Sequence, residues 1–300
     1  MLQSSILGEL AALATAICWT LTALAFESAG KKVGSLPVNI IRLCFAFVIL
    51  GLFSFIRKGM AFPIDASVDA WIWLPISGII GFVIGDLLLF QAFVVIGARI
   101  SMLIMALTPP IAAFFGWLIL GEQMSPVNLI GMTVTIFGIA MVILAKESKN
   151  NQVKIQYSIK GVLLAFGGAV GQGLGLVFSK LGMKDYDPFL STQIRILAGI
   201  IGFAILFTIL GKWKNVINAF SHKKAMTGIT IGSVFGPFLG VSLSLLAIQY
   251  TTTGIASTIM AIVPVLIIIP AVFIFKEKIK AKEIIGALIA FIGVVMFFIF

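Results

Sequence analysis

The chain has 300 residues, of which 60% are hydrophobic and 11% are charged, and its mean hydropathy is +1.17. A soluble domain carries roughly a quarter charged residues. This composition therefore excludes a water-exposed globular surface and predicts an all-α polytopic membrane protein. The net charge of +10 comes from lysines in short loops between apolar segments, which fits membrane lipid headgroups rather than nucleic acid.

Ten apolar segments follow one another, each about long enough to cross a bilayer as a helix. They cover roughly residues 6–27, 37–56, 71–94, 98–120, 126–145, 159–180, 188–211, 225–249, 253–275 and 281–300. No basic region precedes the first segment, which is also too long for a signal peptide, so we expect it to be a retained span. The polar linker 146–158 divides the chain into two five-helix domains, residues 1–145 and 159–300.

The second half of the sequence repeats the first. At a shift of 155 residues, the stretch from Ala98 to Leu144 falls on the stretch from Thr253 to Ile299. Because each half has an odd number of spans, the second copy begins on the opposite side of the membrane. The sequence therefore predicts two inverted five-helix repeats, which are typical of secondary transporters with a binding site near the bilayer midplane.

Prolines and glycines mark corresponding places in the two halves. Pro109 and Pro264 lie inside the fourth and ninth spans, where a proline leaves a carbonyl without its donor. We interpret them as helix breaks beside a transport site, with simple kinks as the alternative. Glycines recur at every fourth residue of the sixth and eighth spans and predict close helix packing. They are Gly167, Gly171 and Gly175, then Gly228, Gly232, Gly236 and Gly240.

Polar side chains inside the spans are the candidates for a substrate cavity. Trp19 and Thr22 share one face of the first span, and Gln172 is the counterpart of Trp19 at a shift of 153 residues. A charge near the bilayer centre costs about 3 kcal/mol or more, so it normally faces the bundle interior and pairs. The candidate set is Trp19, Thr22, Arg42, Asp86, Gln91, Met105, Gln172, Arg195, Ser257 and Thr258.

Asp86 has two possible roles. Either Arg42 neutralises it, or it titrates and couples transport to protons. Its counterpart in the second half is Val241, whereas Arg42 has a counterpart in Arg195. The two arginines either reach toward the membrane surface or face the cavity, where they would favour carboxylates or phosphates and Asp86 would favour cations.

The remaining ionisable residues offer little chemistry. Cys18 and Cys44 lie inside predicted spans, and His222 lies in a basic loop, so we expect no disulfide framework and no metal site. No nucleophile–base set is visible in the spans, so we expect the protein to have no cofactor and no enzymatic activity. Three glutamates at helix ends are expected to be solvated. They are Glu27, Glu122 and Glu277.

Together these features resemble the drug/metabolite transporter superfamily, in particular ten-span proteins built of two EamA domains. The resemblance rests on a set of short matches in order. They are Ala16 to Trp19, Arg42, Arg195, Gly85-Asp86, Ala92, Leu120-Gly121-Glu122, Gly131, Phe275-Lys276-Glu277 and Gly286. It implies an exporter or exchanger of small metabolites, amino acids or drugs, with a cavity between helices 1–4 and 6–9 and with helices 5 and 10 at the periphery.

The sequence thus predicts a secondary transporter of the plasma (bacterial inner) membrane that works by alternating access. No Walker loop is present, so the energy would come from a gradient of the solute, of protons or of a counter-solute. A monomer is expected, with a homodimer as the alternative. The alternative function is a non-transporting integral membrane protein with a lipid-interaction or assembly role.

The orientation of the chain has two conflicting indications. With the N-terminus cytoplasmic, the inside loops would hold 4 basic residues and the outside loops 15. The positive-inside rule therefore favours both termini outside, whereas the resemblance implies that both are cytoplasmic.

Overall fold

The computed structural model describes residues 2–121, 126–146, 153–155, 157–250, 256, 259–276 and 280–299. Seven of the described helical stretches are long and apolar enough to cross a membrane, and two shorter apolar helices accompany them. The described part of the chain is a bundle of helices with one small β-hairpin. The protein is therefore a polytopic α-helical membrane protein, as its composition predicts.

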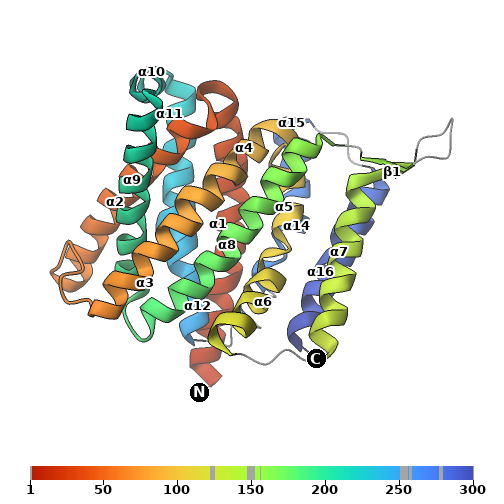
Figure 1. Cartoon of the computed structure of the whole chain (residues 1–300), viewed down its shortest axis with the longest axis horizontal. Coiled ribbons are helices and arrows are strands. Elements are labelled where there is room, and N and C mark those ends of the chain that lie inside the picture. The colour runs from red at the N-terminus through yellow and green to blue at the C-terminus, as the bar shows by residue number, and fades with distance from the viewer. Residues whose placement is uncertain are drawn as a thin grey trace.

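The first half of the chain runs from α1 to α7 (Figure 1). Its third span is continuous but contains a π-helical section, and its fourth is divided into two helices. The elements are α1 (Leu2–Val33), α2 (Ser35–Lys58), α3 (Val68–Gly78), η1 (Ile79–Gly85), α4 (Asp86–Ile96), α5 (Ala98–Met105), α6 (Thr108–Leu120) and α7 (Pro126–Ile143).

The β-hairpin pairs β1 (Leu144–Lys146) with β2 (Val153–Ile155) in antiparallel fashion and leads to the second half. That half adds a short helix, α10, between its second and third spans, where the sequence predicts only a loop. The elements are α8 (Ile159–Met183), α9 (Pro188–Leu210), α10 (Trp213–Phe220), α11 (Lys223–Ser233), η2 (Val234–Gly240), α12 (Val241–Tyr250), α14 (Val263–Leu266), α15 (Ile268–Phe275) and α16 (Ala281–Ile299).

The two halves are inverted repeats. In Figure 1, α1 starts at the end of the molecule where both termini lie, whereas α8 starts toward the opposite end, near β1. The first span of each half packs against the third span of the other: α1 against α11, η2 and α12, and α8 against α3, η1 and α4. The second spans, α2 and α9, pack against each other, and so do the last spans, α7 and α16.

Each third span contains a seven-residue π-helix, and the two match at the shift of 155 residues. A π-helical turn is rare and is often found at a functional site. Here both π-helices carry two glycines and lie against the first span of the other half. A Cβ atom placed on Gly171 of α8 would lie 2.6 Å from the Cα atom of Gly85 in η1. The predicted close packing of the glycine rows is thus confirmed, because the two backbones touch directly.

The last spans form a separate pair at one edge of the molecule (Figure 1). Equivalent glycines bring them together: a Cβ atom on Gly138 would lie 2.4 Å from the backbone nitrogen of Ala290, and one on Gly293 would lie 2.4 Å from that of Thr135. In a membrane, such small residues allow the backbone contact that holds helices together. This arrangement leaves the other eight spans to surround the centre.

Glu283 connects this peripheral pair to the rest of the bundle. Its carboxylate accepts a hydrogen bond from Arg99 of α5 at 2.6 Å and another from the Tyr157 hydroxyl at 3.0 Å. Burial, together with the carboxylate of Glu283, raises the pKa of Tyr157 to about 12. The tyrosine therefore remains a hydrogen-bond donor at any physiological pH.

Glu27 is buried, and the expectation that it is solvated is wrong. Its side chain is 1% exposed, pairs with Lys31, and accepts a hydrogen bond from the backbone N–H of Ala98 at 2.8 Å. Ala98 is the first residue of α5, where backbone N–H groups lack partners within the helix and favour a negative charge. Glu122 and Glu277 lie outside the described residues.

A second polar cluster joins the halves at the end of the molecule opposite the hairpin. Asp187 precedes α9 and accepts hydrogen bonds from the backbone N–H groups of Phe189 and Leu190 at 3.0 and 3.1 Å. It also pairs with Arg57 and Lys58, the last residues of α2. Burial acts to raise the pKa of this carboxyl, but the backbone hydrogen bonds and the two cations outweigh it. The pKa of Asp187 therefore lies below its ordinary value.

We expect Asp187→Asn to lower the thermal unfolding midpoint of the detergent-solubilised protein near neutral pH. Asparagine keeps the helix cap, so the loss is that of the ion pairs, about 1 kcal/mol or 2–4 °C. Because the folded-state pKa lies below that of the unfolded chain, the carboxylate stabilises the fold above about pH 4, and its contribution is lost as the pH falls through the folded-state value. The difference between parent and variant should therefore shrink in acid. A difference that stays constant would contradict this assignment.

Candidate functional site

A cavity lies at the centre of the bundle, between the two halves. Both halves supply its walls. The first half contributes α1, α2, η1, α4, α5 and α6, and the second contributes α8, α9, η2, α12 and α14. Most of the lining is apolar and rich in aromatic rings and methionines. These residues are Trp19, Phe26, Phe82, Phe90, Phe93, Met102, Met105 and Met260.

Most of the residues proposed from sequence come together here. The cavity is lined by Trp19, Thr22, Arg42, Asp86, Met105, Gln172 and Arg195. Gln91 is not among the lining residues: its side-chain oxygen accepts a hydrogen bond from the Ser35 hydroxyl at 2.7 Å. Ser257 and Thr258 lie outside the described residues.

Both prolines line the cavity and stand at helix starts. Pro109 lies in the first turn of α6, just after α5 ends, and Pro264 occupies the equivalent place in α14. A proline in the first turn costs little, because that N–H would have no partner within the helix. The chain between the helices is a tightened helical turn in both halves: the N–H of Leu107 donates to the carbonyl of Ile104 at 3.0 Å, and that of Ile262 donates to the carbonyl of Ile259 at 3.2 Å. Each of these two spans is therefore interrupted beside the cavity without being unwound.

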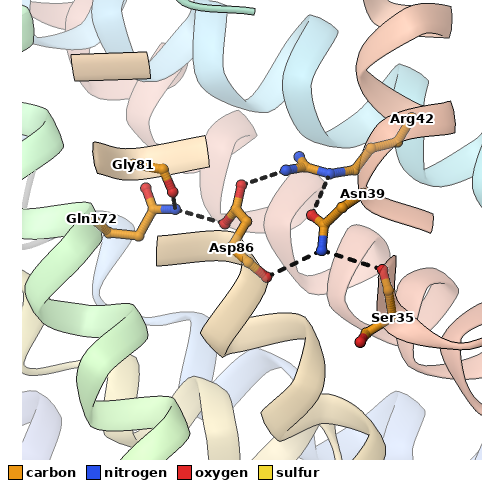
Figure 2. A network of polar contacts seen from close by, with 6 residues as sticks. All are labelled: Ser35, Asn39, Arg42, Gly81, Asp86 and Gln172. Atoms are coloured by element: carbon orange, nitrogen blue, oxygen red, sulfur yellow. Dashed lines mark hydrogen bonds and ion pairs between the residues drawn. The ribbon is translucent and has the colours of Figure 1, made fainter. Parts of the chain in front are cut away.

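Asp86 is the centre of a polar network inside this apolar cavity, and Figure 2 shows its contacts. One carboxylate oxygen accepts a hydrogen bond from Arg42 of α2 at 2.5 Å, and the other accepts one from the Gln172 side-chain amide of α8 at 2.6 Å. Asp86 is the first residue of α4, directly after η1, so the π-helix sets the direction in which its side chain points. The carboxylate thereby joins the first half to the second.

Asn39 orients the arginine of this network. It lies one turn before Arg42 on the same face of α2, and its side-chain oxygen accepts a hydrogen bond from the Arg42 Nε atom at 3.2 Å. Its amide nitrogen donates to the backbone oxygens of Ser35 and Asp86 at 3.2 and 3.3 Å (Figure 2). Asn39 is not among the residues proposed from sequence, although a polar residue three positions before an arginine inside a span could have indicated it.

Aromatic rings complete the surroundings of Arg42. Its guanidinium carbon lies 4.5 Å from the centre of the Phe90 ring, and the rings of Phe26 and Phe82 lie within 6 Å. The side chain is buried, at 4% exposure. Cation–π attraction strengthens when the cation is removed from water, so Arg42 has both a counter-charge and a favourable apolar shell.

Arg195 of α9, the counterpart of Arg42, has a different environment. It is also buried, and its guanidinium carbon lies 4.8 Å from the centre of the Phe82 ring. Among the residues that the structure describes it has no ion-pair partner, and its Nε atom makes no hydrogen bond. The position equivalent to Asp86 is Val241, so the second half provides no carboxylate for it.

Comparison with known proteins agrees with the architecture. A model described as the EamA-like transporter family matches residues 6–144 and, again, residues 159–299. The chain belongs to this family. The family's two-copy match falls on the two inverted halves, and EamA proteins are membrane transporters of the drug/metabolite transporter superfamily.

Named relatives of this EamA protein are also transporters. Human "Solute carrier family 35 member G1" is 24% identical over 47% of this chain and 40% of its own length. An uncharacterised transporter of Clostridium kluyveri is 24% identical over 60% of this chain and 56% of its own length. The uncharacterised inner membrane transporter YhbE of Escherichia coli K12 is 28% identical over 46% of this chain and 42% of its own length. The chain thus spans about half the length of these curated relatives.

A solved structure shares the fold of this EamA protein. The crystal structure superposes with a TM-score of 0.62 over 96% of this chain and 95% of that chain. The sequence identity is 16%, so the likeness concerns the fold alone.

We expect Asp86→Asn to lower the free energy of unfolding by about 3 kcal/mol, because it leaves the Arg42 charge buried without its partner. A double variant, Arg42→Met with Asp86→Leu, should recover most of this loss, since an apolar pair of similar size avoids the buried charge. Unfolding of the purified protein by denaturant measures both.

The matched control is Asp69→Asn. Asp69 pairs with Lys184 at 2.7 Å, but both side chains are more than half exposed, so its loss should cost less than about 1 kcal/mol. Equal losses for the two single variants would show that the buried pair does not stabilise the fold.

Proposed function

We propose that this EamA protein is a secondary transporter that moves a small organic solute across the membrane by alternating access. The observation that carries the proposal is a polar network inside an apolar cavity at the junction of two inverted halves. Such a junction, flanked by a broken helix from each half, is the usual place of a transport site.

The helix contacts support a rocking motion of one half against the other. The backbones of η1 and α8 touch through glycines, and Gly236 and Gly240 of η2 receive Thr22 and Trp19 of α1. Where glycine meets glycine, as at Gly85 and Gly171, no side chains interlock, so one helix can shift against the other at low cost. The π-helices and the interruptions before Pro109 and Pro264 provide the places where a span can bend.

The geometry of Asp86 supports a structural role more than proton coupling. Its two oxygens accept hydrogen bonds from Arg42 and Gln172, and both interactions favour the ionised carboxylate. We propose that Asp86 stays ionised during transport and holds α2, α4 and α8 together around the cavity. A gradient of the solute or of a counter-solute would then drive the cycle, as in an exporter or exchanger.

The cellular location follows from the family and from one relative. YhbE of Escherichia coli is described as an inner membrane transporter. We propose the plasma membrane, the inner membrane of a bacterium, as the location of this protein. We also propose that the chain is not an enzyme: the cavity is a binding chamber whose ionisable groups serve to hold charge.

The test is flux through the reconstituted protein. Proteoliposomes are loaded with a defined mixture of organic acids, amino acids and amines, and the solutes released are identified by mass spectrometry. We expect the parent protein to release at least one solute about tenfold faster than protein-free liposomes.

A cavity-blocking variant and a matched control make this test specific. Met105→Trp puts a larger side chain into the cavity and should abolish release, whereas Leu118→Trp on the following helix faces away from the bundle and should not. Release that is equal in Met105→Trp and in the parent would mean that the cavity is not the transport route. Binding without release of any solute would favour a non-transporting role.

A further inference from the structure

The cavity holds an odd number of charges. Among the described residues, three charged side chains line it: Arg42, Asp86 and Arg195. Asp86 forms its ion pair with Arg42 at 2.5 Å and attracts Arg195 only through space, without a direct contact. One carboxylate therefore faces two guanidinium groups. The part of the lining that the structure describes therefore carries one surplus positive charge.

The environment of Arg195 leaves it free to bind a ligand. A guanidinium has five N–H donors, yet this one makes no hydrogen bond or ion pair among the described residues, and its Nε atom is fully buried. An uncompensated charge in a membrane interior is costly, so such a residue usually has a function. The Phe82 ring holds one face of the guanidinium and leaves its edges as donors.

We propose that the cavity binds a small organic anion with a single negative charge and an apolar body, and that Arg195 holds its carboxylate. This inference rests on the proposed transport function and names the class of its substrate. A guanidinium offers a carboxylate two parallel hydrogen bonds with opposite charge, which is the strong form of such contacts. One surplus positive charge matches one negative charge.

The other charge types fit less well. An amine or the ammonium group of an amino acid needs a negative counter-charge, but Asp86 is already paired with Arg42, and the charge of Arg195 repels a cation. A dianion would bring one negative charge more than the lining can neutralise. The ring- and methionine-rich wall then favours an apolar or aromatic body, because methionine and aromatic surfaces adapt to such groups.

Three probes of one shape separate these possibilities. We would measure the dissociation constants of 3-phenylpropionate, 3-phenylpropanamide and 3-phenylpropylamine for the full chain in lipid nanodiscs, through ligand-dependent unfolding midpoints. We expect the carboxylate to bind about tenfold or more tightly than the amide, and the amine to bind no better than the amide. Equal binding of carboxylate and amide, or tighter binding of the amine, would overturn the proposal.

Variants of the two arginines provide a second readout. Arg195→Gln should lose the preference for the carboxylate, and Arg195→Lys should keep part of it. Without ligand, Arg195→Gln should unfold at the same temperature as the parent or higher, because it removes an unmatched buried charge, whereas Arg42→Gln should unfold at a lower temperature. Arg57→Gln, at the far end of α2, should keep the carboxylate preference. If Arg195→Gln were as unstable as Arg42→Gln, Arg195 would be a structural residue and the proposal would be wrong.

This experiment is independent of the flux assay. If the protein transports neutral or cationic solutes and the carboxylate shows no preferential binding, the transport function stands and the anion proposal fails. If the carboxylate binds through Arg195 but no solute crosses the membrane, the anion site stands and the transport function fails.

Discussion

The ion pair between Arg42 and Asp86 is the interaction on which the rest of the site depends. Two opposite charges inside a membrane protein are stable only while both remain hydrogen-bonded and matched. Here the match joins α2 to the start of α4, and Gln172 extends it to α8 in the other half. The pair therefore fixes the geometry of three cavity walls. Because Arg42 is in direct contact with the carboxylate, its charge is balanced there, whereas Arg195 has no such contact.

Inverted duplication explains both the symmetry and the asymmetry of this protein. The backbone features occur twice: the π-helices in the third spans, the interruptions before Pro109 and Pro264, and the glycine contacts between the last spans. The cavity side chains do not. Trp19 stands where the other half has Gln172, and Val241 stands where the first half has Asp86. The repeated backbone provides a frame that can move, and the unequal side chains give the cavity its chemistry.

Much of the fold could be read from the sequence because the relevant signals are long. Apolar runs of bilayer length, an odd number of spans per half and the shift of 155 residues predict inverted repeats without any knowledge of contacts. Seven candidate site residues line the cavity, and five of them could be found because polar or charged groups inside apolar spans are costly and stand out. These five are Thr22, Arg42, Asp86, Gln172 and Arg195. Gln91 is also a polar residue inside an apolar span, but its side chain accepts a hydrogen bond from Ser35 and does not line the cavity. The sequence alone does not show which face of a helix meets the cavity.

The features that were missed depend on local geometry. A π-helix shifts the register of backbone hydrogen bonds without a distinct composition, so the glycine pairs in η1 and η2 gave only an indirect signal. The burial of Glu27 depends on the start of α5, which lies 71 residues later in the chain. The missing partner of Arg195 also emerges only when the distances are known, because its counterpart Arg42 is fully paired.

The cavity has a surplus positive charge because Val241 stands where a second aspartate would complete the symmetry. The most direct test is the dissociation constant of 3-phenylpropionate for Val241→Asp, with Val241→Asn as a control of nearly the same size. Our account predicts that the added carboxylate weakens binding of the anion about tenfold or more, while the asparagine variant binds close to the parent. Unchanged binding in Val241→Asp, or an equal loss in both variants, would contradict it.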